Sequence, residues 1–173
     1  MKFASVIAAA LLLLVSATAN AQSVSFDFDK TARFSSFRTY AWIRGTEVPD
    51  EFNHARVVDA VNTQLVAKRL APAPATARPD LFVAYHAVFD RSVQITGFAD
   101  GFGPYRLGRS VSARTNEIVT GTLVVDLIDA ATNTIVWRGI AAKEIDVKAD
   151  PRAREKNINR VAARLFKNYP PAN

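Results

Sequence analysis

The sequence predicts one α+β domain with a mixed, mostly antiparallel sheet of about five to six strands and two helices packed on one face. Several segments alternate apolar and polar residues, as half-buried strands do, and two others repeat apolar residues at helical spacing. The chain has 173 residues, of which 49% are hydrophobic, so one core of ordinary size can form. The order strand, strand, helix, strand, further strands and helix is typical of a layered α+β domain.

The first 21 residues are expected to be a secretory signal peptide. Lys2 precedes an apolar run over residues 6–15, and Ala19 and Ala21 form the small-residue pattern at which such peptides are cleaved. The apolar run is too short to cross a membrane comfortably. We therefore expect residues 22–173 to form a single domain, exported to the periplasm as a soluble protein without a transmembrane segment.

The amino-acid composition limits the kinds of chemistry that this protein can perform and the kinds of partner that it can bind. The sequence has no cysteine, which excludes a disulfide framework, a thiolate metal site, a cysteine nucleophile and a lipid anchor on cysteine. Lys2 is the only charge in the first 21 residues, so 21 of the 22 basic residues stand against 16 acidic ones, a net charge of about +5. For an exported protein, the candidate partners are an envelope protein, an anionic lipid or an envelope polymer rather than nucleic acid. The oligomeric state is left open.

Two strands and a helix are expected first. Residues 23–30 place three apolar side chains on one face, and residues 37–43 form a second strand, so the two are candidates for a hairpin. Helical spacing follows Pro49 and Asp50 and continues to Arg69. The apolar stripe of this helix comprises Phe52, Ala55, Val58, Val61 and Leu65.

A central strand and a long loop are expected next. Residues 71–79 are rich in proline and alanine and form a stiff connection, and residues 80–90 carry apolar side chains on both faces, as a central strand does. Residues 91–110 hold four of the seven glycines and are expected to form a long loop, of the kind that is often functional. Its candidate binding residues are Phe98, Phe102, Tyr105, Arg106 and Arg109.

The stretch GTLVVDLIDAATNTIVWRGIA predicts a hairpin whose register decides the role of two charges. A three-residue loop that ends in a left-handed Asn133 pairs Ala130 with Thr134. The same register places Asp126 opposite Arg138. A loop one residue longer would instead place Asp126 opposite a residue whose side chain belongs to the other face of the sheet. The favoured register also gives an uninterrupted apolar face of Leu123, Val125, Leu127, Ile135 and Trp137.

We interpret Asp126 and Arg138 as a structural pair, because a guanidinium and a carboxylate satisfy each other through two parallel hydrogen bonds. The pair lacks a nucleophile, a base that titrates near neutrality and a set of metal ligands, so no catalytic residue is assigned. His54 and His86 are the only histidines, too few for a zinc site without cysteine. We expect neither a metal ion nor a cofactor.

The last helix has the clearest sequence signals. Asp150 at the N-cap and Pro151 at the first helical position precede a regular apolar stripe, and prolines at 170 and 171 end the element. Its basic residues are Arg152, Arg154, Lys156, Arg160, Arg164 and Lys167. They are either an ordinary solvated face or a surface for an anionic membrane. Two arginines in the first turn oppose the helix dipole slightly.

Four blocks of sequence carry a family resemblance: FDFDKTARFSSFRTYAWI, RPDLFVAYHAV, GTLVVDLIDAATNTIVWRGIA and VAARLFKNYPP. Together, and in this order, they resemble the bacterial envelope family known as domain of unknown function 4136, over nearly all of residues 22–173. The family is typically exported and often lipid-anchored through a cysteine, which this chain replaces with Ala21 and Gln22. The resemblance implies fold and location, but no activity.

Two hypotheses of function follow. The favoured one is a non-catalytic periplasmic binding or assembly module that contacts its partner through the long loop or the basic helix. The alternative is a small periplasmic hydrolase or transferase that uses His86 with a carboxylate, since catalytic triads are spatial rather than sequential arrangements.

Overall fold

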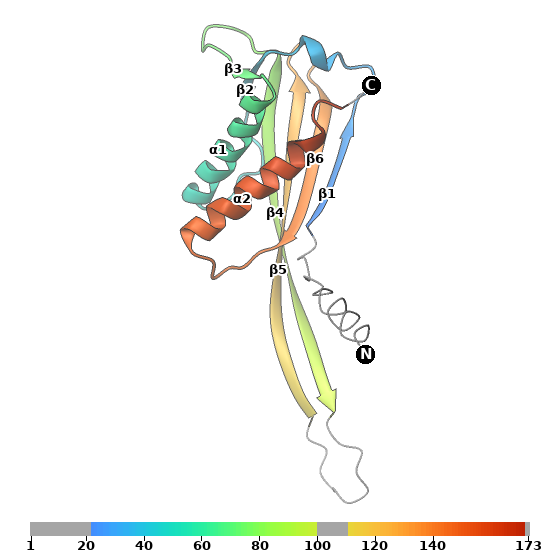
Figure 1. Cartoon of the computed structure of the whole chain (residues 1–173), viewed down its shortest axis with the longest axis vertical. Coiled ribbons are helices and arrows are strands. Elements are labelled where there is room, and N and C mark those ends of the chain that lie inside the picture. The colour runs from blue at the N-terminus through green and yellow to red at the C-terminus, as the bar shows by residue number, and fades with distance from the viewer. Residues whose placement is uncertain (1–21, 100–110, 172–173) are drawn as a thin grey trace, which may run out of the picture.

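A computed structural model describes residues 22–99 and 111–171, and it confirms the α+β class (Figure 1). Within these residues six strands form one mixed sheet in the order β1-β6-β5-β4-β2-β3. The strands are β1 (Ser23–Phe28), β2 (Thr39–Trp42), β3 (Ala71–Pro72), β4 (Leu81–Ala99), β5 (Val111–Asp129) and β6 (Thr134–Glu144). Helices α1 (Glu51–Ala67) and α2 (Pro151–Leu165) lie on the same face of the sheet. Among the described residues no helix has the length and apolarity that crossing a membrane requires.

The expected hairpin between the first two strands is wrong. β1 pairs antiparallel with β6 at one edge, whereas β2 runs parallel to both β4 and β3 near the other. The intervening chain forms a short 3-10 helix, Phe34–Ser36, and buries Phe34 and Phe37 in the core. Burial of these two rings carries the chain across the end of the sheet instead of turning it back on β1.

Residues 91–99, which were predicted to belong to a long loop, continue strand β4 instead. β4 and β5 pair in one continuous antiparallel ladder from Leu81 opposite Asp129 to Ala99 opposite Val111. Figure 1 shows the end of this hairpin leaving the rest of the sheet as a two-stranded ribbon. The glycines in this part of the sequence suggested a loop. Antiparallel pairing nevertheless gives the backbone of both strands its hydrogen bonds.

The β5–β6 hairpin places Asp126 opposite Arg138, as expected, but by another route. The turn contains four residues instead of three, so Asp129 and not Ala130 pairs with Thr134. A β-bulge next to Leu127 and Ile128 then restores the register of the remaining ladder. Asn133 is left-handed, with φ 57°. The bulge turns Val136 into the core and leaves Ile135, expected there, exposed.

Helix α1 begins and ends close to the predicted residues. The carboxylate of Asp50 accepts a hydrogen bond from the backbone N–H of Asn53 at 2.9 Å, which caps the first turn. Val57, Ala60, Val61 and Leu65 are the buried side chains. Phe52 was expected on this stripe but is 76% exposed, because it precedes Val57 by five positions and so lies more than a third of a turn away.

Helix α2 packs closely on β6 through a glycine. A Cβ atom on Gly139 would lie 2.8 Å from Cγ of Leu165 and 2.4 Å from the ring of Trp137, so only glycine permits this approach. The predicted N-cap is present, since the carboxylate of Asp150 accepts from Ala153 N at 2.9 Å. Past the helix, Phe166 stacks on Trp137 at a centroid distance of 5.0 Å. This contact closes the core between α2 and the sheet.

Candidate functional site

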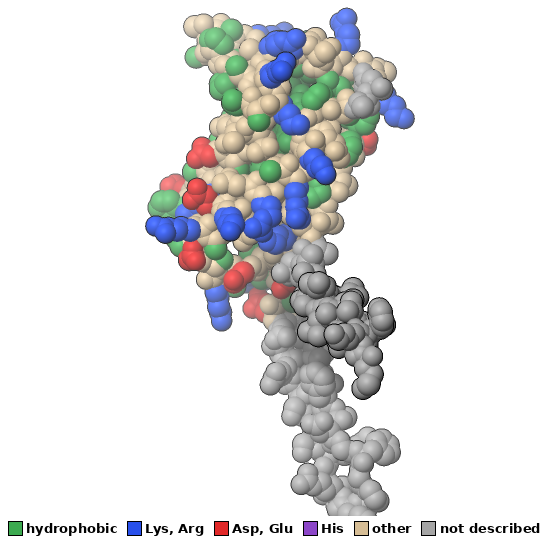
Figure 2. Space-filling model, in the orientation of Figure 1, with side chains coloured by type: hydrophobic (Ala, Val, Ile, Leu, Met, Phe, Trp, Pro, Cys, Tyr) green, Lys and Arg blue, Asp and Glu red, His purple; other side chains and the backbone are tan. Residues whose placement is uncertain are grey.

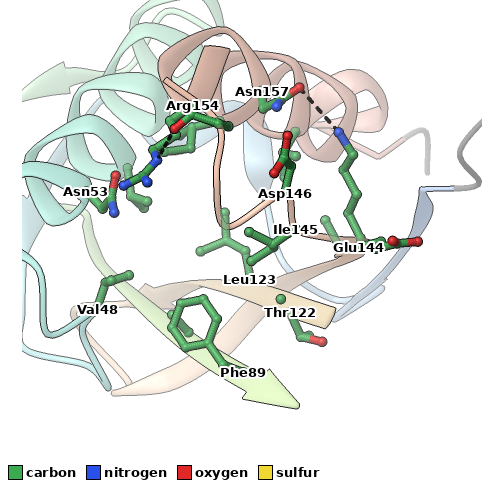
Figure 3. A pocket seen from close by; sticks show the side chains of 18 of the residues that line it. Val48, Asn53, Phe89, Thr122, Leu123, Glu144, Ile145, Asp146, Arg154 and Asn157 are labelled. Atoms are coloured by element: carbon green, nitrogen blue, oxygen red, sulfur yellow. Dashed lines mark hydrogen bonds between the residues drawn. The ribbon is translucent and has the colours of Figure 1, made fainter. Parts of the chain in front are cut away.

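A cavity of about 320 Å³ lies between the sheet and the two helices (Figure 3). Its floor comes from β4, β5 and β6, and its walls come from α1, α2 and the segment that joins β6 to α2. Small residues at Ala87, Gly121 and Ala141 leave space above the sheet at this level. The volume is at the lower end of the range of small-molecule sites, about 300–1,000 Å³.

Apolar side chains line the interior of the cavity. Leu123 and Phe89 belong to the floor, and Val57 of α1 and Ile158 and Val161 of α2 belong to the walls. Phe89 is 47% exposed, so the cavity opens to solvent beside its ring. A partly open apolar hollow is costly to leave in water, because the hydrophobic effect favours filling it.

The segment between β6 and α2 forms a fixed wall of the cavity. Ile145 N donates to Val119 O at 2.7 Å, which ties the start of the segment to β5. The Arg154 guanidinium donates from Nε to Ala149 O at 2.9 Å and from Nη2 to Val147 O at 3.1 Å. These bonds explain an arginine in the first turn of α2, where it opposes the helix dipole.

Two cations, Lys143 and Arg154, line the cavity, and the edge at Lys143 is called its mouth below. Nζ of Lys143 donates to Oδ1 of Asn157 at 3.3 Å, a bond drawn in Figure 3. Among the described residues no carboxylate oxygen lies within 4.0 Å of this ammonium group. Glu144 directs its carboxylate away from the cavity (Figure 3), and Asp146 accepts from Lys148 N at 2.9 Å within its own turn. The ammonium of Lys143 is thus available to a ligand.

Asp126 and Arg138 lie on the other face of the sheet, away from the cavity. Arg138 donates to Asp126 from Nε at 2.6 Å and from Nη2 at 2.7 Å, which is bidentate geometry. Asp126 is 2% exposed, whereas the side chain of Arg138 is 44% exposed. These hydrogen bonds raise the pKa of Arg138 above its ordinary value. A role for the pair in holding the sheet together stays a prediction.

His86 lies beside this pair, with Nε2 3.6 Å from Oδ2 of Asp126. Its Nδ1 receives the backbone N–H of Thr46 at 3.1 Å, and Oγ1 of Thr46 is also 3.1 Å away. A backbone N–H can only donate, so Nδ1 carries the lone pair and Nε2 carries the proton in the neutral ring. Both nitrogens are therefore engaged by groups of the fold.

His54 lies apart from His86, on α1. Its Nδ1 is 2.7 Å from the hydroxyl of Tyr85, which also accepts from Val48 N at 3.2 Å. Burial raises the pKa of Tyr85 above its ordinary value. No group of three or more His, Asp or Glu side chains placed to hold a metal ion occurs among the described residues.

The residues predicted to bind through the long loop cannot be placed in a site. The backbone of Phe98 belongs to β4, and its side chain lies outside the described part of the chain, as do Phe102, Tyr105, Arg106 and Arg109. That binding surface stays a prediction. The cavity was not predicted, although apolar Ile145 and Val147 between charged neighbours were a signal, since connecting segments are usually polar.

Comparison with known proteins gives a family and a fold. The family described as Domain of unknown function (DUF4136) matches residues 24–171. The structure is similar to a DUF4136 family protein from Bacteroides thetaiotaomicron, with TM-score 0.54, 15% identity, and coverage of 88% of this chain and 97% of that one. It is also similar to a PDZ domain protein from Parabacteroides distasonis, with TM-score 0.58, 13% identity and 88% of this chain covered. This chain spans 37% of the length of the latter. No curated protein matches.

The two structural likenesses concern the fold alone, because their sequence identities are low. The family match, in contrast, extends over nearly all of the described residues, from β1 to the segment after α2. The chain therefore belongs to the DUF4136 family, whose function is unknown.

Proposed function

We propose that this protein is a non-catalytic envelope binding module, exported by residues 1–21, and that the cavity beneath α1 and α2 is its ligand site. The observation that carries the proposal is the apolar lining of that cavity together with its opening beside Phe89. An apolar hollow with a few polar groups at its rim is the usual form of a small-molecule site.

The polar groups around the cavity favour binding over catalysis. Arg154 is occupied by the carbonyl groups of its own loop, and Asp146 by the turn at Lys148. Asn157 accepts from Lys143. The described lining contains no His, Ser or Tyr side chain, and among the described residues neither of its candidate nucleophiles, Thr122 and Lys143, is hydrogen-bonded to a base.

The hydrolase alternative centres on His86 and Asp126. Catalysis requires an imidazole nitrogen that can take a proton from a nucleophile. In this structure Thr46 N–H occupies Nδ1, and Arg138 occupies both oxygens of Asp126. Binding is therefore the better supported function. His86→Ala decides between the two, because turnover of any ester or glycoside substrate that disappears in this variant would favour the enzyme.

The cavity is tested with an uncharged fluorescent apolar probe, N-phenyl-1-naphthylamine, titrated with residues 22–173. Saturable binding of one probe per chain is expected. Ala87→Phe and Leu123→Trp fill the cavity and should abolish the fluorescence increase. The matched control is Val88→Phe, which adds a similar ring on the neighbouring position of β4, where the side chain is 56% exposed on the other face.

Circular dichroism of each variant shows whether the fold is intact. If the probe binds equally well to the wild type and to both filled variants, the ligand site is elsewhere and the proposal fails. If no saturable binding is measured to the wild type, the cavity does not function as an apolar site. Fractionation of cells that express the full chain tests export, since a protein retained in the cytoplasm contradicts the envelope assignment.

A further inference from the structure

The chemistry of the cavity identifies a class of ligand, on the assumption that the proposed binding function is correct. We infer that the cavity takes an anionic amphiphile with one unbranched hydrocarbon chain, such as a fatty acid, with the chain above Leu123 and the anionic group at Lys143. Three features support this class of ligand: the size of the cavity, the chemistry of its interior and the charge at its mouth.

The volume of about 320 Å³ suits one chain and not a two-chain lipid. It is at the bottom of the range for ligand sites, about 300–1,000 Å³. The interior offers contacts to methylene groups from the sheet floor at Leu123 and from the facing helices at Val57 and Val161. Each methylene group buried there is expected to raise the affinity about fourfold.

The mouth selects for negative charge. Lys143 is the lining lysine, and its bond to Asn157 places the ammonium group at the junction of β6 and α2. The other lining cation, Arg154, is committed to two carbonyl oxygens of the loop. An incoming carboxylate would gain a charge-assisted hydrogen bond from Lys143, with the amide of Asn157 next to it.

The surroundings of the mouth add to this preference. Figure 2 shows Lys and Arg side chains gathered over α2 on the face that carries the helices. The exposed members of this group are Arg152, Lys156, Arg160, Arg164 and Lys167. Acidic side chains lie in the same region, with Glu144 and Asp146 in the lining and the exposed Glu155 on α2, so the basic residues of α2 give an excess of positive charge and not a field of one sign. An excess of positive charge raises the local concentration of an anionic ligand relative to a neutral one.

Three ligands with the same chain distinguish the head groups: decanoate, decanol and decyltrimethylammonium, each used to displace N-phenyl-1-naphthylamine. For the wild type we expect decanoate to bind about tenfold more tightly than decanol, since hydrogen bonds to charged groups are the stronger ones. Decyltrimethylammonium should bind most weakly. Added salt should reduce the difference between decanoate and decanol.

Lys143→Gln tests the residue that carries the inference. This variant should bind decanoate about as weakly as decanol, while the affinity for decanol stays that of the wild type. The matched control is Lys148→Gln, in the segment that follows β6, where the lysine is exposed and does not line the cavity. It should keep the tenfold preference, which shows that the cation at the mouth, and not net charge, decides.

The two proposals fail in different ways. If the uncharged probe does not bind, the binding function itself is wrong. If the probe binds but decanoate shows no advantage over decanol, or keeps its advantage in Lys143→Gln, the cavity is an apolar site and the inference of an anionic ligand is wrong. Tighter binding of decyltrimethylammonium than of decanoate would overturn the inference in the same way.

Discussion

Replacing Arg138 with methionine should destabilise the fold by about 3 kcal/mol, because it removes the charged partner of a buried carboxylate. Asp126 is 2% exposed and, among the described residues, would retain only Nε2 of His86, at 3.6 Å. Removal of one partner of a buried ion pair costs about 3–5 kcal/mol. We take the lower end of that range, because the side chain of Arg138 is 44% exposed and water already reaches part of the pair.

Asp126→Asn should cost less than Arg138→Met. In that variant the half-exposed guanidinium can turn towards water, so about 1–2 kcal/mol is expected from the weakened hydrogen bonds. The double variant Asp126→Leu, Arg138→Met should regain most of the loss, because replacing a whole buried pair by apolar residues is often neutral. If the pair is structural, the two single variants should therefore lose different amounts of stability, and the double variant should be nearly as stable as the wild type.

The measurement is urea unfolding followed by far-ultraviolet circular dichroism, with the thermal midpoint as a second value. A loss of 3 kcal/mol corresponds to a decrease of roughly 6–12 °C in a domain of this size. Arg91→Met is the matched control, since Arg91 is 3.9 Å from Glu117 and both side chains are largely exposed. It should cost less than about 0.5 kcal/mol. An Arg138→Met variant as stable as Arg91→Met would refute the reasoning.

Three further predictions concern titration and close packing. Burial raises the pKa of Tyr169 to about 12. Between pH 10, which is about its pKa in the unfolded chain, and pH 12 the folded state keeps a proton that the unfolded state loses. Stability should therefore fall as the pH rises through this range, by up to about 1.4 kcal/mol per pH unit. Urea titrations of Tyr169→Phe should show a shallower alkaline slope, and an unchanged slope counts against this assignment. Gly45→Ala should lower stability by about 2 kcal/mol, because its Cβ would lie 2.0 Å from a backbone carbonyl of β4. In Gly121→Ala the new Cβ meets only the flexible end of a side chain, so the loss of stability should be smaller. Equal losses in thermal unfolding would contradict the steric argument. The backbone N–H of Arg38 donates to Asp80 and lowers its pKa. The stabilisation that Asp80 contributes is therefore complete above its pKa in the unfolded chain and is lost as the pH falls through its pKa in the folded state. Asp80→Asn should flatten the acid side of the profile of stability against pH, and a profile as steep as that of the wild type would assign the acid dependence to other groups.

The ends of the helices were predictable, whereas the pairing of the first two strands was not. Capping residues such as Asp50 and Asp150 act on neighbouring backbone, so local sequence defines where a helix begins. The pairing of β1 with β6 depends on contacts between residues more than a hundred positions apart. Alternation identifies a strand in the sequence, but it does not identify the neighbour of that strand.

The β5–β6 hairpin shows how one prediction was right in part. The polar and apolar pattern correctly placed Asp126 opposite Arg138, because only that register keeps charges off the helix-bearing face. The turn was one residue longer than expected, and a bulge compensated for it. Sequence patterns report the average register of a ladder, whereas a bulge near the turn depends on how Val136 packs in the core.

The cavity was out of reach because it is a property of packing. It arises where small side chains of three strands lie opposite residues of two helices, and no local motif encodes that coincidence. The ion pair, in contrast, could be predicted, because its prediction required only two charged residues and the register of one hairpin. The same limit applies to Lys143, whose position at the mouth follows from the approach of α2 to β6.

The most direct test of the account is a nuclear magnetic resonance measurement on residues 22–173 with carbon-13-labelled decanoate. Nuclear Overhauser effects should connect methylene protons of the bound chain to the methyl groups of Leu123, Ile145 and Val161, and these effects should be lost in Ala87→Phe. Effects that reach only side chains on the other face of the sheet, such as Val124, or that persist unchanged in Ala87→Phe, would contradict a ligand site between the sheet and the two helices.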